Sequence, residues 1–85
     1  MNFCLAVFRS RTQVLEFIDG MKARGIPCGA VNTPARAHIG CGISAKFDFG
    51  RLPYAREVIY SDGLNTFNGF YRVEQIGFRT TVTKI

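Results

Sequence analysis

The spacing of apolar residues changes several times along this chain of 85 residues, and these changes constrain the fold more than any other feature. Residues 3–8 are almost entirely apolar, as expected of a central strand that helices cover on at least one face. Over residues 10–24, apolar side chains recur at helical spacing, namely Val14, Leu15, Ile18 and Met21. We therefore predict a strand followed by a helix whose buried stripe is formed by these four residues.

The ends of this helix are marked by local signals. Ser10 and Gln13 have the spacing of a capping box, in which side chains satisfy the free N–H groups of a helix start. Gly25 is a typical helix stop. Residues 26–31 then predict a second strand, and Pro27 places it at a sheet edge or lies at its start, because proline cannot donate a ladder hydrogen bond.

A third strand is predicted over residues 42–49 by a period of two. Its apolar positions are Ile43, Ala45, Phe47 and Phe49. The intervening positions are polar, namely Ser44, Lys46 and Asp48. This alternation is typical of a half-buried strand.

The second half of the chain predicts another helix and at least one more strand. Pro53 occupies the favoured first position of a short helix that turns Ala55, Val58 and Ile59 inward. That helix closes at residues 61–63, Asn68-Gly69 predicts a turn, and residues 70–75 predict a fourth strand. Residues 78–85 are expected to form either a fifth, short edge strand or a loose tail.

The resulting order βαββαβ predicts an α+β, ferredoxin-like sandwich with a four-stranded antiparallel sheet and two helices on one face. The chain is short enough for a single domain over residues 1–85, with a core of about residues 3–75 and residues 76–85 as edge strand or tail. In this topology strands one and three are antiparallel neighbours at the centre of the sheet.

Composition narrows the functional classes. No apolar run approaches the length of a membrane span, and no signal peptide is evident, so a cytoplasmic location without membrane contact is expected. The three cysteines form no C-x-x-C pair, which favours free thiols in a reducing compartment. Dimerisation would help so small a domain, so a homodimer is a possible state.

The candidate site is the thiol of Cys41, which lies between Gly40 and Gly42 at the entrance to the third strand. The glycines give flexibility and leave the sulfur uncrowded. Arg36 and His38 lie just upstream, and no acid occurs between residues 19 and 48. This interval is interpreted either as a solvated basic loop or as a site for a thiolate, a small anion or an acidic partner.

The predicted topology brings further positive charge towards this site. The end of strand one would lie beside the start of strand three, which brings Arg9, Arg11 and the start of the first helix towards Cys41. Cations and a helix N-terminus both favour a thiolate. Cys4 and Cys28 lie within apolar strand patterns, so we interpret them as packing residues.

Other chemistries find little support in the sequence. Metal-ligand spacing is absent, so we expect no zinc site from His38 and the cysteines. Paired carboxylates, a Ser-His-Asp set and a phosphate-binding glycine fingerprint are also absent, and no cofactor is expected. Aromatic residues of the predicted strands could stack on bases only if the sheet face were open, namely Phe47, Phe49, Phe70 and Tyr71.

Several of these features together resemble a family of selenium/sulfur carrier protein-like domains. They are the opening apolar strand, a helix with a short Gly25-Ile26 turn, Thr33-Pro34, a basic loop, and Cys41-Gly42 leading into an alternating strand. The resemblance covers about residues 3–74. It implies a carrier that holds sulfur or selenium on Cys41, with a cysteine desulfurase-like donor and an acceptor protein as partners.

Two hypotheses from different functional classes follow. The first is a thiol carrier rather than a stand-alone enzyme, with a persulfide or selenopersulfide on Cys41. The alternative is a non-catalytic binding or assembly module that recognises nucleic acid or another anion through the basic loop. The pH dependence of thiol labelling and the salt dependence of nucleic-acid binding separate the two.

Overall fold

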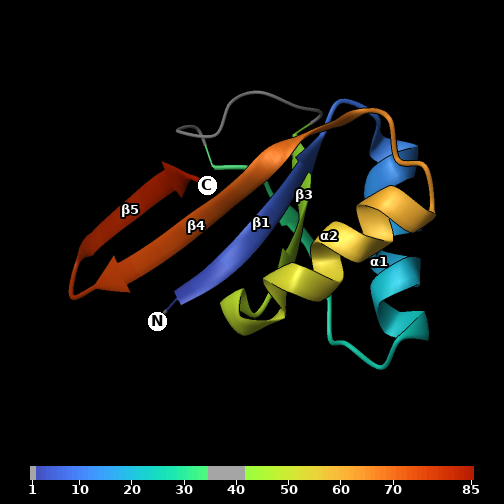
Figure 1. Ribbon diagram of the computed structural model, residues 1–85. Coiled ribbons are helices and arrows are strands. Elements are labelled where there is room, and N and C mark those ends of the chain that lie inside the picture. The colour runs from blue at the N-terminus through green and yellow to red at the C-terminus, as the bar shows by residue number, and fades with distance from the viewer. Residues whose placement is uncertain (1, 35–41) are drawn as a thin grey trace.

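The computed structural model describes residues 2–34 and 42–85. The elements in chain order are β1 (Asn2–Phe8), α1 (Arg11–Ala23), β2 (Gly29–Asn32), β3 (Ile43–Phe47), a 3₁₀ turn (Phe49–Arg51), α2 (Leu52–Ser61), β4 (Phe67–Ile76) and β5 (Arg79–Lys84). These elements match the predicted alternation of strands and helices, and the α+β class is confirmed (Figure 1).

The five strands form one antiparallel sheet in the order β2-β3-β1-β4-β5. As predicted, β1 pairs antiparallel with β3, with Cys4 opposite Phe47 and Val7 opposite Ser44. The order differs from the predicted four-stranded, ferredoxin-like sheet because β5 is added beside β4. The chain from Arg79 to Lys84 is therefore an edge strand and not a loose tail.

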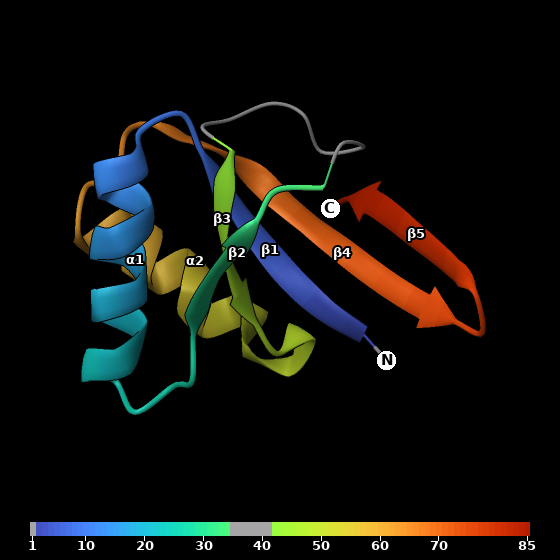
Figure 2. The same cartoon turned by 180° about the vertical axis from the view of Figure 1, so that it is seen from behind.

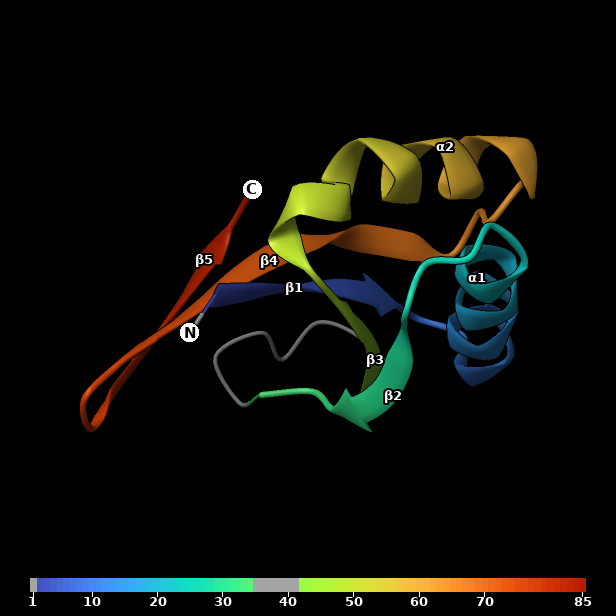
Figure 3. The ribbon, with the colours of Figure 1, turned by 90° about the horizontal axis from the view of Figure 1, so that it is seen from below.

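Both helices pack against the same face of the sheet. Their buried side chains share one core cluster with Cys4, Ala6 and Phe8 of β1. Figure 3 shows that the β4–β5 hairpin extends away from these helices. On the opposite face, Leu5 and Val7 form a second cluster with buried residues of β4. Because both faces of β1 are buried, the strand is apolar at almost every position, as the sequence predicted.

The buried stripe of α1 differs from the prediction at one residue. Val14, Ile18 and Met21 are buried as expected, but Leu15 is 50% exposed and Phe17 takes its place in the core. The prediction for Leu15 was wrong because positions 14, 17, 18 and 21 form one helical face, and position 15 lies about a quarter turn to its side. The Phe17 ring fills the space between Phe8 and Phe47, with ring centroids 5.6 and 5.8 Å away.

The helix ends and the edge position of β2 follow the local signals. The Ser10 side chain accepts a hydrogen bond from the Gln13 N–H, which caps α1. The strand β2 is an edge strand that begins at Gly29, two residues after Pro27. The helix α2 has its proline in the first turn and buries Ala55 and Val58, as predicted, with Ile59 partly buried beside them.

The predicted turn at Asn68-Gly69 is wrong, because both residues lie inside β4. Gly69 pairs with Val7, and the register shifts next to it, between Val7 and Phe8. Gly69 has φ +142°, which fits such an irregularity. The pairing of β4 with β1 and the packing of the Phe67 ring on Phe8, at 5.5 Å, override the local turn preference. The hairpin turn lies at Gly77 instead, with φ +61°.

Candidate functional site

The segment that carries the predicted thiol lies outside the described residues. These undescribed positions include Arg36, His38, Gly40 and Cys41. The structure does describe the residues that flank this segment, and a backbone hydrogen bond joins the two sides. The N–H of Thr33 donates a hydrogen bond of 2.9 Å to the carbonyl oxygen of Gly42, which extends the β2–β3 pairing by one position beyond Asn32 and Ile43.

Gly42 is the one predicted site glycine that the structure describes. Its φ of +88° lies in the region that favours glycine, and a Cβ placed on it would meet nothing within 4 Å. A side chain at this position would therefore be disfavoured by backbone conformation and not by crowding. The sequence predicted a flexible glycine here, and the structure shows a specific conformational requirement.

A pair of hydroxyl groups holds the same two strands together. The side-chain oxygens of Thr33 and Ser44 lie 2.5 Å apart, and either one can be the donor. Ser44 is fully buried although the sequence placed it on the polar side of its strand. Because β3 lies between β2 and β1, Ser44 is enclosed by Val31 and Val7 on the neighbouring strands. Sequence reasoning missed this pair, since it is apparent only once the β2–β3 register is known.

The start of α1 lies at the same end of the sheet as the start of β3 (Figure 2). The pairing of Val7 with Ser44 places Arg9 near the level of Gly42. The Arg9 N–H donates to the Thr66 carbonyl at 2.9 Å, while the side chains of Arg9 and Arg11 are exposed. Within the described part of the chain, neither guanidinium forms an ion pair with a carboxylate. Whether these arginines act on Cys41 stays a prediction.

Gln13 links the helix start to the segment before β4. Its side-chain oxygen accepts hydrogen bonds from the N–H of Thr66, at 2.9 Å, and from the Thr66 hydroxyl, at 2.7 Å. Its side-chain nitrogen donates to the Asn65 side chain at 2.8 Å. The predicted capping box therefore forms only in part, since Gln13 uses its side chain to fix a distant segment beside the N-terminus of α1.

The other two thiols are packing residues. Cys4 is fully buried and Cys28 is 9% exposed. Burial raises the pKa of the Cys4 thiol to about 11, against the opposing effect of the nearby Arg56 and Arg72 guanidinium groups. Burial likewise raises the pKa of the Cys28 thiol to about 11, against the effect of Lys22. Both thiols are therefore protonated near neutral pH and poor nucleophiles.

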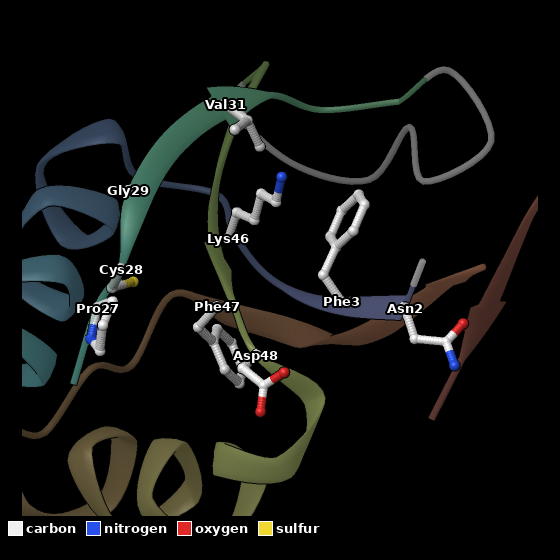
Figure 4. Close-up of a pocket in the computed structure, with 9 residues that line it drawn as sticks. All are labelled: Asn2, Phe3, Pro27, Cys28, Gly29, Val31, Lys46, Phe47 and Asp48. Atoms are coloured by element: carbon white, nitrogen blue, oxygen red, sulfur yellow. The ribbon is translucent and has the colours of Figure 1, made fainter. Parts of the chain in front are cut away.

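A cavity of about 520 Å³ opens at the other end of β3 from Gly42. Figure 4 shows its lining, which comes from the starts of β1 and β2 and the end of β3, and includes Phe3, Cys28, Val31 and Lys46. The Lys46 ammonium lies 4.4 Å from the centre of the Phe3 ring, so a cation–π contact holds it at the rim. The sequence alone does not reveal this cavity, because its lining residues come from three separate segments.

The described residues were also searched for a metal site, a membrane-spanning helix and exposed aromatic rings that could stack on bases. Over residues 2–34 and 42–85, no three side chains of His, Cys, Asp or Glu gather as metal ligands would. Helices in this part of the chain are all too short or too polar to span a membrane. The aromatic rings considered for base stacking are largely enclosed, since Phe47, Phe70 and Tyr71 are buried and Phe49 is partly buried.

The fold and the cysteine environments define a small α+β domain in which two thiols are buried and the third belongs to the segment between β2 and β3. The chain belongs to the family described as "Putative Se/S carrier protein-like", whose model matches residues 3–72. The resemblance expected from the sequence is thereby confirmed. Comparison with curated proteins and with solved structures gives no significant match.

Proposed function

We propose that this chain is a sulfur or selenium carrier in which Cys41 holds the transferred atom as a persulfide or selenopersulfide. The observation that carries the proposal is the family match over residues 3–72, a range that includes Cys41. The burial of Cys4 and Cys28 supports it, because a thiol with a pKa of about 11 is a poor acceptor at neutral pH. Cys41 is then the remaining cysteine for this role.

The proposed transfer consists of two balanced thiol exchanges. In the first, the Cys41 thiolate attacks the outer sulfur of a donor persulfide. The donor sulfur–sulfur bond breaks, the donor cysteine leaves as a thiolate, and Cys41 becomes a persulfide. In the second, an acceptor thiolate attacks that outer sulfur and the Cys41 thiolate leaves. Neither step needs an external oxidant or reductant, and a selenium atom in the outer position follows the same scheme.

The charges expected around Cys41 suit this chemistry. Arg9 and Arg11 are exposed at the end of the sheet where β3 begins, and α1 also begins there. Arg36 and His38 are the sequence neighbours of the thiol. Cations and a helix start lower the pKa of a cysteine below its usual value of about 8.5. Because a less basic thiolate is also a weaker nucleophile, the gain in rate at neutral pH should be moderate.

The partners of a carrier of this kind are a donor, such as a cysteine desulfurase, and an acceptor protein with a free thiol. Cys41 can accept sulfur only as a free thiol, and cytosolic thiols are kept reduced, so the proposal includes a cytoplasmic location. We test loading by measuring the intact mass of the protein after incubation with a cysteine desulfurase and cysteine. The expected product carries the mass of one additional sulfur atom, and dithiothreitol removes it.

Single-cysteine variants assign the loaded residue. We expect Cys41→Ser to lose the additional mass, whereas Cys4→Ala and Cys28→Ala should keep it. Loading of Cys41→Ser to the same extent as the parent would contradict the proposal. So would a parent protein that gains no sulfur from a desulfurase shown to be active on a known acceptor.

The alkylation rate as a function of pH tests the role of the arginines. Cys41 should react fastest of the three thiols, and a variant with Arg9→Ala and Arg11→Ala should raise its apparent pKa. The matched control is Lys22→Ala with Arg24→Ala, which removes the same charge near the opposite end of α1. If all three thiols react at equal rates and the protein binds nucleic acid with a steep salt dependence, the binding-module hypothesis replaces the carrier.

A further inference from the structure

The strand β5 leaves one side of the sheet without a partner in the described part of the chain. Its other side pairs with β4, from Tyr71 opposite Lys84 to Ile76 opposite Arg79. The sheet order ends at β5. Figures 1 and 2 show that the β4–β5 hairpin extends past the rest of the sheet, away from both helices. No strand within residues 2–34 and 42–85 pairs with this outer side.

The hydrogen-bond pattern shows which backbone groups face outward. The Ile85 N–H donates to the Phe70 carbonyl at 2.9 Å, so the backbone of Ile85 faces β4. In an antiparallel ladder this direction alternates with every residue. The N–H and C=O groups of Val82 and Lys84 therefore face away from β4. An extended segment laid along β5 would meet them at the spacing of a strand ladder.

The composition of β5 suits strand addition. Four of its six residues are β-branched, and the strand has neither a proline nor a break in register. Proteins usually protect such edges with proline, bulges or charges. Here the protection is limited to two cations at the ends, Arg79 and Lys84. The exposed apolar side chains of Ile76 and Phe78 at the hairpin tip, 74% and fully exposed, offer further contact to a partner.

Charge distinguishes between a second copy of this chain and another partner. If two copies of β5 paired antiparallel, outward-facing residues would lie opposite one another, and the joined edge would carry the two cations of β5 from each copy and no acid. Repulsion among these cations, with no acid on either strand to offset it, disfavours such a pair. After residue 62 the chain has a single acid, Glu74, and its carboxylate already lies 3.7 Å from the Arg72 side chain. The β5 edge is thus cationic and disfavours its own copy.

We propose that the outer edge of β5 binds an extended acidic segment of a partner protein, which adds a sixth antiparallel strand to the sheet. The register defines the sequence that fits best. An acidic residue lies opposite Lys84, an apolar residue two positions later lies beside Val82, and a second acid lies opposite Arg79. This strand addition uses backbone groups for affinity and side chains for selectivity. It does not depend on the chemistry of Cys41.

The probe is a capped peptide that follows this register, acetyl-Glu-Thr-Val-Thr-Thr-Glu-amide. Its control carries lysine in place of both glutamates. Binding to the Cys41→Ser protein is followed by the backbone amide resonances in NMR titrations at low salt. The acidic peptide should bind about tenfold more tightly than the basic one, and added salt should reduce the difference. The largest shifts and the strongest slowing of hydrogen exchange should occur at Val82 and Lys84.

Two variants test the mechanism. Arg79→Glu with Lys84→Glu should reverse the preference, so that the basic peptide binds more tightly. The matched control, Lys22→Glu with Arg24→Glu, changes net charge equally on α1 and should keep the parent preference. Val82→Pro removes one outward N–H while the inward bonds of its neighbours remain, so it should abolish binding of both peptides.

Three results would overturn the proposal. The first is equal binding of the acidic and basic peptides to the parent protein. The second is a set of shifts that lies outside β5. The third is self-association in sedimentation equilibrium that protects the Val82 and Lys84 amides without any peptide, since a second copy would then occupy the edge. Because the protein used lacks the Cys41 thiol, none of these results bears on sulfur loading.

Discussion

Replacing Phe17 by alanine should be among the most destabilising single changes in α1, and replacing Leu15 should not. Phe17 is fully buried, and its ring lies 5.6 Å from Phe8 and 5.8 Å from Phe47 between centroids. Loss of a buried phenylalanine costs about 3–5 kcal/mol, and the two ring contacts place Phe17 in the upper half of this range. Leu15 is 50% exposed on the same helix, so its truncation should cost about 1 kcal/mol or less.

The two variants form a matched pair, because each replaces one apolar residue by the best helix former in the same element. Urea unfolding followed by circular dichroism gives the free energy of unfolding for each. In a domain of this size 1 kcal/mol shifts the melting temperature by about 4–8 °C, so Phe17→Ala should melt more than about 16 °C below the parent. If Leu15→Ala costs as much as Phe17→Ala, the orientation of α1 on the sheet is wrong.

Three further predictions concern Gly42, the Thr33–Ser44 pair and the buried thiols. Gly42→Ala should lower the free energy of unfolding by about 1–2 kcal/mol in urea titrations because of its positive φ, whereas Gly29→Ala, in a strand with open space around it, should be neutral or stabilising. A double-mutant cycle with Ser44→Ala and Thr33→Val should give a coupling of about 1 kcal/mol, and a cycle without coupling would show that the hydroxyl groups do not interact. The raised pKa of the Cys4 and Cys28 thiols contributes stability that is fully present below the pKa of an unfolded thiol and is lost as pH rises towards about 11. Each thiol accounts for about 3 kcal/mol, so the free energy of unfolding should decline less from pH 8 to pH 11 when both cysteines are replaced by alanine.

Local chemistry made several elements predictable from the sequence. The cap at Ser10 and the stop at Gly25 depend on residues within one turn of the helix end, and α1 ends where they indicate. The apolar run from Phe3 to Phe8 identified the central strand, because only a strand buried on both faces is apolar throughout. These features need no knowledge of distant segments.

The misplaced elements depend on partners that are distant in sequence. The choice between Leu15 and Phe17 for the core depends on where Phe8 and Phe47 lie, and the helical period does not contain that information. Asn68-Gly69 has the composition of a turn, yet pairing with β1 holds it extended. A local preference of about 1 kcal/mol is easily overridden by a strand pairing of this length.

In the candidate site, too, some features follow from the local sequence and others depend on residues that are distant in the chain. Cys41 was identified by its two glycine neighbours and by the absence of acids around it, and both features lie in the local sequence. The contact between Thr33 and Ser44 required the strand register, since 11 residues separate them in the chain. The outward amides of β5 likewise became apparent only when the pairing of residues 79–84 was established. Sequence reasoning thus identified the proposed reactive atom but not the surfaces around it.

The two proposed sites are positioned so that a carrier could use them together. The chain enters β3 directly after Gly42. Two strands, β1 and β4, lie between β3 and β5. At about 4.8 Å for each strand interval, the two strands lie about 14 Å apart. A partner strand bound along β5 would therefore not occupy the place where β3 begins. Docking and sulfur exchange should then be separable in kinetics. Arg79→Glu with Lys84→Glu should slow transfer to an acidic acceptor protein without changing loading of Cys41 by a small-molecule persulfide, whereas Cys41→Ser should abolish loading without changing peptide binding.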